Sequence, residues 1–453
     1  MINMEICMEM SLGSPSGQFK VMPVALGKGQ PRGFAAFFSG CYDIDSSYDM
    51  FVFPSDALKA IVFTERGEIL WKKEVGIIPG AAFYNFYVLD LDRDGVDEIF
   101  FVNNSDPEHP FAFEKFVLER VDTLTGQTTG QWPWPCYGGY SQSLQHTFRN
   151  HIFGGMVGAQ PVLVTAQGTY GDMFLQGWNP DLSLRWERTI TKTDPGARGS
   201  HSFPVVDINQ DGVDEVMWGE RCISLATGQD VFLIEPNWHG HSDNCQPVWD
   251  RGNGRWCVYI NRESDEEIPP RVGLYDNHGN RIWVDVDWGH IHKGWVGRIG
   301  SQGELIATAA RITGQTKDSV GRYYTGITEF TYDAMTGKPV KLPYSIFDTA
   351  PVDVNGDGFH EILRGVASGT TELLDRNGKV LANLGGKVAM NSKILDLPGE
   401  QVMCYYQSGM VRIWRDTNAA DTPAARSRYS HPFYQRNQRA RNIENNICML
   451  GGI

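Results

Sequence analysis

The sequence predicts an all-β fold, a β-propeller of seven blades, with eight blades as the alternative. Three observations carry this prediction: an acidic loop that occurs three times, a strand–turn–strand signature, and a composition suited to short strands. The signature recurs at a period of roughly fifty residues, which is typical of propellers and other closed arrays of small sheets.

The acidic loop has oxygen-bearing side chains at its first, third and fifth positions, glycine at the sixth and glutamate at the ninth. Such a loop can surround a hard cation with oxygen ligands, and the glycine allows a sharp turn. Each copy lies between two apolar runs, so it connects strands, whereas an EF-hand loop connects helices. An acidic turn without metal is the alternative. The predicted calcium ligands are Asp90, Asp92, Asp94 and Glu98, then Asp207, Asn209, Asp211 and Glu215, then Asp353, Asn355, Asp357 and Glu361.

The second signature is a strand, a turn built on aspartate or asparagine with glycine, and a further strand that often carries tryptophan. Its copies make seven full units and a fragment, which lie at residues 60–71, 118–126, 176–186, 222–228, 272–283, 330–337, 373–380 and 410–414. The fragment can share a blade with a strand predicted at 19–24, as closure of a propeller requires, or it can form an eighth blade.

Composition supports a single β domain. Aromatic residues make up 12% of the chain and glycines number 50, and no stretch keeps a 3.6-residue apolar period, so helix should be scarce. We expect one propeller over residues 19–420. Residues 421–453 differ because arginine clusters there with asparagine and glutamine, and we expect an arm that packs on the propeller or a mobile basic end.

Charge and cysteine content exclude several classes. A net charge of -14 argues against nucleic acid and anionic membranes as partners, since both require a basic surface. The eight cysteines lack framework spacing, so most should be buried thiols. No stretch is a convincing signal peptide or reaches transmembrane length. We expect a soluble monomer, cytoplasmic as written, or secreted or periplasmic if the N-terminus is truncated.

Polar clusters precede the first strands of four successive units, and each contains histidine. His151, His201, His241 and His292 hold the same place in their repeats. Equivalent positions of successive blades converge around the axis of a propeller, so these histidines can line one central cleft. A histidine at a strand start is also commonly a hydrogen-bonding group without catalytic role, and this alternative stays open for each.

Two sets of residues carry the ligand types that zinc prefers. One set is His239, His241 and Cys245, and the other is His290 and His292. An H-x-H spacing on a strand places both rings on one face. No second cluster accompanies either set in the sequence, so zinc stands as an alternative beside calcium.

Several motifs resemble those of the calcium-containing β-propeller polysaccharide lyases. These are Arg198-Gly-Ser-His201 with the loop after it, Gly240-His241-Ser-Asp243, and the tail segments 429–436 and 442–446. Rhamnogalacturonan lyases carry Arg-Gly-Asn-His and Gly-His-Gly-Asp versions of the first two. Segment 149–170 resembles the ulvan lyase and rhamnosyl-glucuronate lyase branch, whose members are described as seven-bladed.

The resemblance implies cleavage of a rhamnose- and uronate-containing polysaccharide by β-elimination. This reaction needs a group that neutralises the uronate carboxylate, a base that takes the C5 proton and an acid that protonates the departing O4. Histidine and tyrosine can exchange protons, and arginine binds a carboxylate bidentately. The expected catalytic residues are His151, Tyr170 and Arg221, and the expected substrate-binding residues are Asn150, Gln167, Arg198, His201, His241, His292 and Arg298.

Two other classes stay open, because the scaffold alone does not fix the reaction. A related propeller is a rhamnosidase, and a hydrolase of that type would need two carboxylates or an unusual histidine mechanism. A non-catalytic propeller that binds glycan or protein is the other, since calcium loops of this type also occur in adhesion propellers. The expected partner for a lyase is an anionic polysaccharide or oligosaccharide.

Overall fold

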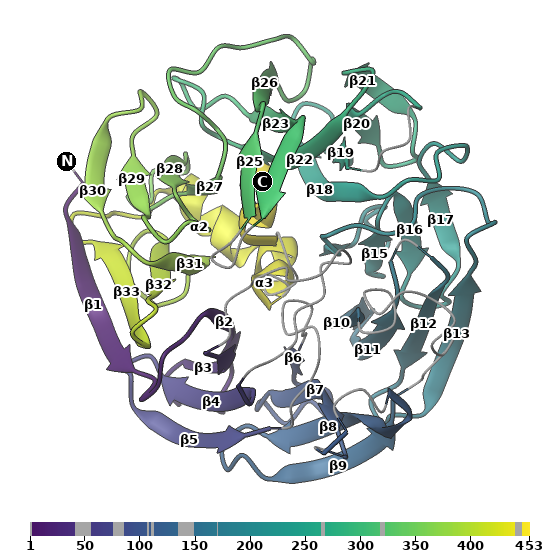
Figure 1. Ribbon diagram of the computed structural model, residues 1–453, viewed down its shortest axis with the longest axis vertical. Coiled ribbons are helices and arrows are strands. Elements are labelled where there is room, and N and C mark those ends of the chain that lie inside the picture. Colours follow the sequence, from purple (N-terminus) through teal and green to yellow (C-terminus); the bar gives the residue numbers. More distant parts are fainter. Residues whose placement is uncertain are drawn as a thin grey trace.

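The computed structural model describes residues 2–40, 56–75, 86–106, 108–109, 113–134, 149–169, 171–263, 268–317, 322–439 and 446–453. Within these residues, eight small antiparallel sheets stand around a common axis as the blades of a β-propeller (Figure 1). The all-β prediction is therefore confirmed. The count of seven blades is corrected to the alternative of eight.

Six blades are four-stranded sheets in which consecutive strands pair in order. In each, the first strand lies nearest the axis and the fourth lies outermost (Figure 1). The strands are β2 (Gln18–Val24), β3 (Gly33–Ser39), β4 (Lys59–Thr64) and β5 (Ile69–Glu74); β6 (Phe86–Leu89), β7 (Glu98–Asn104), β8 (Phe116–Asp122) and β9 (Thr128–Pro133); β10 (Asn150–Val157), β11 (Gln160–Gln167), β12 (Met173–Trp178) and β13 (Leu184–Ile190); β14 (Val205–Val206), β15 (Glu215–Trp218), β16 (Arg221–Ser224) and β17 (Asp230–Leu233); β18 (Ser242–Asp250), β19 (Arg255–Arg262), β20 (Val272–Asp276) and β21 (Arg281–Asp285); β27 (Thr349–Val352), β28 (Glu361–Arg364), β29 (Glu372–Leu374) and β30 (Val380–Asn383).

One blade has three strands and an added hairpin. Its strands are β22 (His290–Gly297), β23 (Ile306–Ile312) and β26 (Thr328–Asp333), and the hairpin of β24 (Gly314–Lys317) and β25 (Arg322–Thr325) lies between the last two in sequence. This blade carries His290 and His292 on its innermost strand.

The ring is closed by a strand that the sequence did not reveal. β31 (Lys387–Ser392), β32 (Gln401–Tyr405) and β33 (Met410–Asp416) are joined by β1 (Met4–Ser11), which pairs antiparallel with β33. The predicted closing segment 19–24 lies instead in β2, the inner strand of the next blade. In β1, Met8 and Met10 face the core, whereas Glu5 and Glu9 face outward, as alternation on a half-exposed edge strand requires. The propeller therefore begins before residue 19.

The tryptophan and glycine of the repeated signature meet across neighbouring blades. Trp71 Nε1, on an outer strand, donates to the carbonyl of Thr123 in the next blade at 2.7 Å. Gly126 in the same turn has a φ of +71°, and a Cβ there would lie 2.6 Å from the Trp71 ring. The arrangement recurs for Trp186 with Gly228 and for Trp283 with Gly337. Glycine thus allows both the turn and the approach of the neighbouring ring.

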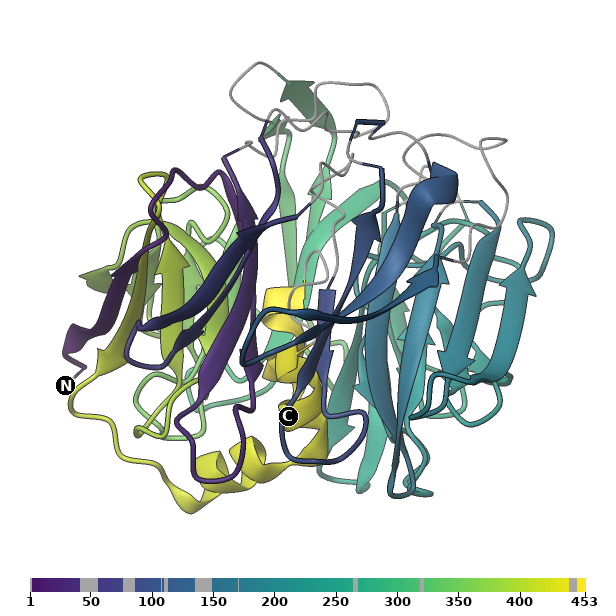
Figure 2. The same ribbon diagram turned by 90° about the horizontal axis from the view of Figure 1, so that it is seen from below.

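The C-terminal arm comprises α2 (Pro423–Ser430), α3 (Pro432–Arg439) and the 3-10 helix η5 (Asn446–Gly452). Its helices lie at one end of the propeller and part of the arm reaches into the centre (Figure 2). Thr422 caps α2, accepting a hydrogen bond from the Ala425 amide. Phe433 and Tyr434 are buried, so the described part of the arm is packed and not free. Both α-helices, like every other helix in the described residues, fall short of what is needed to cross a bilayer.

Candidate active site

The histidines and the acidic loops lie at opposite ends of the innermost strands. β22 starts at His290 and ends at Gly297, and the next residue, Arg298, donates its amide to Nδ1 of His360 in the third acidic loop at 2.9 Å. Eight residues of extended strand span on the order of 25 Å. The acidic loops therefore cannot contribute directly to chemistry at the histidines.

Four histidines converge on one carboxylate at the blade starts. The Nε2 atoms of His201 and His241 each lie 2.8 Å from Oε2 of Glu263. The Nε2 atoms of His290 and His292 each lie 3.1 Å from the other oxygen, Oε1. All except His290 are buried, and His290 is about one-third exposed. Successive blades around the centre supply these side chains through the approach to β14, the starts of β18 and β22, and the end of β19 (Figure 1).

The electrostatics of the cluster favour an ionised Glu263 carboxylate beside a neutral His241 ring. Burial alone would raise the pKa of Glu263, but the neighbouring histidines, His292 and His201 foremost, hold it well below its usual range. Burial lowers the pKa of His241 to about 3, although Glu263 opposes this shift. Asp243 accepts from His292 Nδ1 at 3.2 Å, and this contact fixes Nε2 of that ring toward Glu263. The Nε2 atoms of the four rings therefore face one shared carboxylate.

The donor set fits a divalent metal ion. His201, His241 and Glu263 offer one ligand atom each within 4.8 Å of one another, and so do Glu263, His290 and His292. Neutral imidazole nitrogens with one carboxylate suit zinc and similar transition metals better than calcium, which prefers oxygen ligands. The Asp243 contact to His292 has the form of the outer partner that orients a metal-binding histidine.

Of the two zinc-binding sets predicted from the sequence, the structure brings one together and not the other. His290 and His292 do place both rings on one side, with Nε2 atoms 2.5 Å apart. His239 instead contacts Arg198, whose Nη2 lies 2.9 Å from its Nδ1. Cys245 lies in the buried core. The set of His239, His241 and Cys245 is therefore not formed, and His241 joins the Glu263 cluster instead.

His151 lies beside this cluster but outside the metal set. It is fully buried on β10, with its ring 4.5 Å from that of Phe203 and 5.5 Å from that of Trp218. Burial, together with the charges of Arg149 and Lys20, holds the pKa of His151 well below its usual value. The histidine is therefore neutral. Arg149 also lowers the pKa of His241, so its positive charge is close to both rings.

The polar residues predicted around His151 are placed on neighbouring strands. Asn150 and Gln167 face each other across the β10–β11 ladder, and both are buried. Asn150 Oδ1 accepts a hydrogen bond from Trp134 Nε1 at 2.9 Å. Tyr170, the predicted catalytic partner of His151, lies outside the described residues.

Each of the three predicted arginines has side-chain contacts to groups other than the four histidines of the Glu263 cluster. Arg198 donates to the carbonyls of Asp194, Gly196 and Lys192, which makes it a brace for the chain before His201. Arg221 pairs with Asp230 and donates to the Pro195 carbonyl. Arg298, predicted to bind substrate, lies at the acidic-loop end and is corrected on that ground, since the length of β22 separates it from His290.

The acidic loops keep one geometry in all three copies. The first-position Asp90, Asp207 and Asp353 each accept from the amide of the glycine at position six, at 3.0–3.1 Å. The ninth-position Glu98, Glu215 and Glu361 each accept from the amide that follows the first position. Burial, with nearby carboxylates, raises the pKa of Glu98 to about 7 and that of Glu215 to about 8. A bound cation would relieve this concentration of negative charge.

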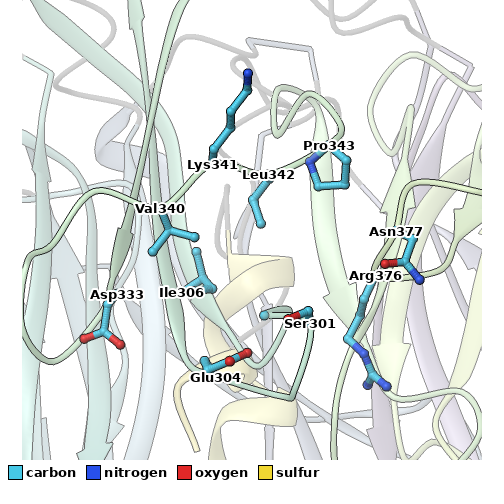
Figure 3. Close-up of a pocket in the computed structure, with 11 residues that line it drawn as sticks. Ser301, Glu304, Ile306, Asp333, Val340, Lys341, Leu342, Pro343, Arg376 and Asn377 are labelled. Carbon is cyan, nitrogen blue, oxygen red and sulfur yellow. The ribbon is translucent and has the colours of Figure 1, made fainter.

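A surface pocket of about 330 Å³ lies apart from the histidines. Figure 3 shows Asp333, Val340 and Ile306 on one of its sides and Arg376 and Asn377 on another. None of the residues that line it belongs to the Glu263 cluster. The pocket is therefore separate from the candidate active site.

Sequence reasoning missed Glu263, which joins the two histidine pairs. Its sequence signal was an acid at the end of a blade's second strand, within the run Glu263-Ser-Asp-Glu-Glu267. Such a run is usually a solvated surface stretch. Only the pairing of β18 with β19, which brings residue 263 back to the blade start beside His241, distinguishes this glutamate.

Comparison with known proteins supports the fold. No family model matches the chain. An alignment of 213 positions, which covers 39% of the chain, gives 26% identity to "Rhamnogalacturonan exolyase YesX" of Bacillus subtilis (strain 168). The alignment covers 34% of that relative's length.

Three solved structures share the architecture over nearly the whole chain. The exotype rhamnogalacturonan lyase YesX has a TM-score of 0.77 at 18% identity, with 97% of this chain and 80% of that chain covered. Rhamnogalacturonan lyase YesW has 0.72 at 17% identity, with 97% and 80% covered. The PL11 rhamnogalacturonan lyase of Bacillus licheniformis has 0.74 at 17% identity, with 98% and 81% covered. The resemblance to propeller polysaccharide lyases is thereby confirmed at the level of the fold.

Proposed function

We propose that this chain is a polysaccharide lyase that cleaves a rhamnose- and uronate-containing polysaccharide by β-elimination at the blade-start end of the propeller. The observation that carries the proposal is the convergence of His201, His241, His290 and His292 on Glu263, beside the neutral, buried His151. The relatives with the same fold are named as rhamnogalacturonan lyases, which supports this reaction class.

The residues divide the reaction between them. A divalent metal ion held by the Glu263 cluster would neutralise the uronate carboxylate and so acidify the C5 proton. His151 is neutral, so it would take the C5 proton while Tyr170 protonates the departing O4. In the reverse assignment Tyr170 takes the C5 proton, and His151 can give a proton to O4 only after it has itself been protonated. Arg149 adds positive charge close to His151 and His241, where an anionic sugar would have to be held.

The calcium sites in this proposal are structural. The three acidic loops supply oxygen ligands from Asp and Asn side chains in a repeated geometry, and hard oxygen ligands favour calcium over transition metals. They lie at the far end of the innermost strands from His290, so their contribution is to stability.

The uronate that the reaction requires limits which polysaccharides can be substrates. An eliminating enzyme needs a 4-linked uronate, and the relatives' names point to galacturonate alternating with rhamnose. The ulvan-like and rhamnosyl-glucuronate linkages meet the same chemical requirement. One assay should therefore compare rhamnogalacturonan, ulvan and arabinogalactan, the last of which is tested for the rhamnosyl-glucuronate linkage.

The test is incubation of the protein with rhamnogalacturonan, ulvan and arabinogalactan while ultraviolet absorbance and reducing ends are followed together. A lyase raises both signals, because elimination leaves an unsaturated uronate that absorbs. New reducing ends without absorbance would indicate the hydrolase, and binding without either signal would indicate a non-catalytic propeller. His109→Ala, at an exposed histidine paired with Asp106, serves as the control for histidine substitutions.

A further inference from the structure

An exposed tryptophan lies beside the histidine cluster. Trp288 is 54% exposed, more than any other large apolar side chain among the described residues. It precedes His290 by two residues, and His290 is the one cluster histidine with substantial exposure. The ring therefore offers a flat apolar face at the edge of a polar site, which a ligand can contact.

Arg311 supports this ring from beneath. Its guanidinium carbon lies 4.0 Å from the centroid of the Trp288 ring and 5.4 Å from that of Phe330. Arg311 lies on β23, opposite Ile291 of β22, so the pair sits one residue from the histidine strand's start. Gly289 leaves room for the arginine stem, because a Cβ there would lie 2.5 Å from Arg311 Cδ. The pair is thus built into the blade.

The charge of Arg311 has no partner in the described part of the chain. Its guanidinium makes neither a hydrogen bond nor an ion pair there, and its Nε is buried. The protein carries a net charge of -14, so carboxylates are abundant, yet among the described residues none forms an ion pair with this cation. Guanidinium N–H groups lie in the plane of the group, so a ring stacked on its face leaves its edge able to bind an acceptor.

We propose that Trp288 and Arg311 form a subsite for an anionic sugar, in which a uronate packs against the indole ring and its carboxylate meets the edge of the guanidinium. A sugar carries an apolar face of C–H groups that suits an aromatic ring, and a uronate adds the planar carboxylate that arginine binds bidentately. This inference rests on the proposed function, since it places in this subsite the next uronate of the same polysaccharide, which is separated from the reacting uronate by one rhamnose.

The experiment measures binding without turnover. A rhamnose–galacturonate tetrasaccharide and its carboxyl-reduced counterpart are titrated calorimetrically into protein carrying His151→Asn, so that the ligand is not consumed. Trp288→Ala and Arg311→Met are compared in this background with Trp132→Ala and Arg120→Met. Arg120 lies 5.7 Å from the Trp132 ring on another blade, which makes this pair a matched control.

We expect protein carrying only His151→Asn to bind the acidic tetrasaccharide more tightly than the carboxyl-reduced one. Arg311→Met should lower the ratio of the two affinities about tenfold or more, the effect of losing one charge-assisted contact. Trp288→Ala should weaken binding of both ligands, and the control pair should weaken neither. Unchanged affinities in Trp288→Ala and Arg311→Met would overturn the subsite. If these losses of affinity occur but the protein without any substitution generates no unsaturated products, the subsite is supported and the lyase proposal is wrong.

Discussion

Arg439 Nη1 lies 2.8 Å from Asp97 Oδ1, an ion pair that ties the end of α3 to the first acidic loop. Asp97 occupies the eighth position of its loop, and the same position is contacted by the arm twice more. Arg436 pairs with Asp214, and Arg428 Nη1 lies 3.0 Å from Nε2 of His360.

Each eighth-position residue also binds the preceding blade. Asp97 Oδ2 accepts from the Ala25 amide at 2.7 Å, and Asp214 Oδ2 from the Met156 amide at 2.6 Å. His360 repeats the role with Nδ1, which accepts from the Arg298 amide. The arm therefore contacts a residue at each of three junctions between neighbouring blades, next to the predicted calcium ligands.

Arg428→Met should destabilise the fold strongly. Arg428 is buried and contacts Glu400 at 2.8 Å and Asp353 at 3.4 Å, so its loss leaves two buried carboxylates without their cation. Breaking such a buried arrangement costs about 3–5 kcal/mol, to be measured by urea unfolding. Arg426→Met, on the exposed side of the same helix, is the control and should change stability by less than about 0.5 kcal/mol. Equal effects of the two substitutions would contradict the role of Arg428.

Removal of calcium should lower the melting temperature. An ion that binds only the folded protein stabilises it by mass action, so a chelator should shift the melting curve downward and added calcium should restore it. Asp207→Ala, which removes the first ligand of the second loop, should lower the melting temperature and reduce the shift that the chelator produces. A melting curve that does not respond to the chelator would exclude calcium from the acidic loops.

Glu263→Gln should empty the histidine site. The substitution keeps the shape of the side chain but removes the charge that faces all four imidazoles. We expect the transition-metal content of the purified protein, measured by elemental analysis, to fall at least about tenfold, the scale seen when metal-site partners are lost. Calcium content should not change, because the acidic loops lie at the other end of the strands. Unchanged transition-metal content in Glu263→Gln would show that Glu263 is not a ligand, and unsubstituted protein that contains no transition metal would show that the cluster is a hydrogen-bonded assembly without metal.

His151→Asn should abolish most turnover while the fold persists. A positioned general acid or base contributes about a hundredfold or more to the rate. His151 packs on Phe203 and Trp218, so asparagine also leaves a small gap, and a modest fall in melting temperature is expected. Retained metal content would separate a loss of proton transfer from damage to the neighbouring cluster. Near-normal rates on every uronate polysaccharide tested would remove His151 from the mechanism.

Local repeats in the sequence predicted the architecture because each repeat has a local physical cause. The pairing of Trp71 with Gly126 has equivalents in other blades because the tryptophan ring of one blade packs on the glycine turn of the next. The histidines at blade starts predicted a shared centre, and His201, His241 and His292 do meet there. These predictions needed only the period and the alternation of strands.

Other features depend on pairings that the sequence does not display. Met4–Ser11 was not recognised as the closing strand because its acids interrupt an apolar run, and only pairing with β33 explains them. Glu263 was missed since a strand-end acid is common on surfaces. Arg298 was placed with the histidines because it is near them in sequence, but an extended strand carries eight residues from one end of the propeller to the other.

Arg221 provides the sharpest contrast between a structural and a catalytic role. The sequence predicts that Arg221 binds the substrate carboxylate, and this prediction is still to be tested. In the structure its guanidinium pairs with Asp230 and donates to the Pro195 carbonyl, and the residue is 3% exposed. We therefore expect Arg221→Ala to lower the free energy of unfolding by about 1–2 kcal/mol through lost hydrogen bonds, and to leave turnover of a uronate polysaccharide unchanged. Arg221→Lys should fall between, because lysine keeps the charge but loses the planar fork that reaches both partners. Unfolding and initial rates should be measured on the same preparations. A fully folded Arg221→Ala protein that fails to cleave would assign the carboxylate-binding role to Arg221 after all.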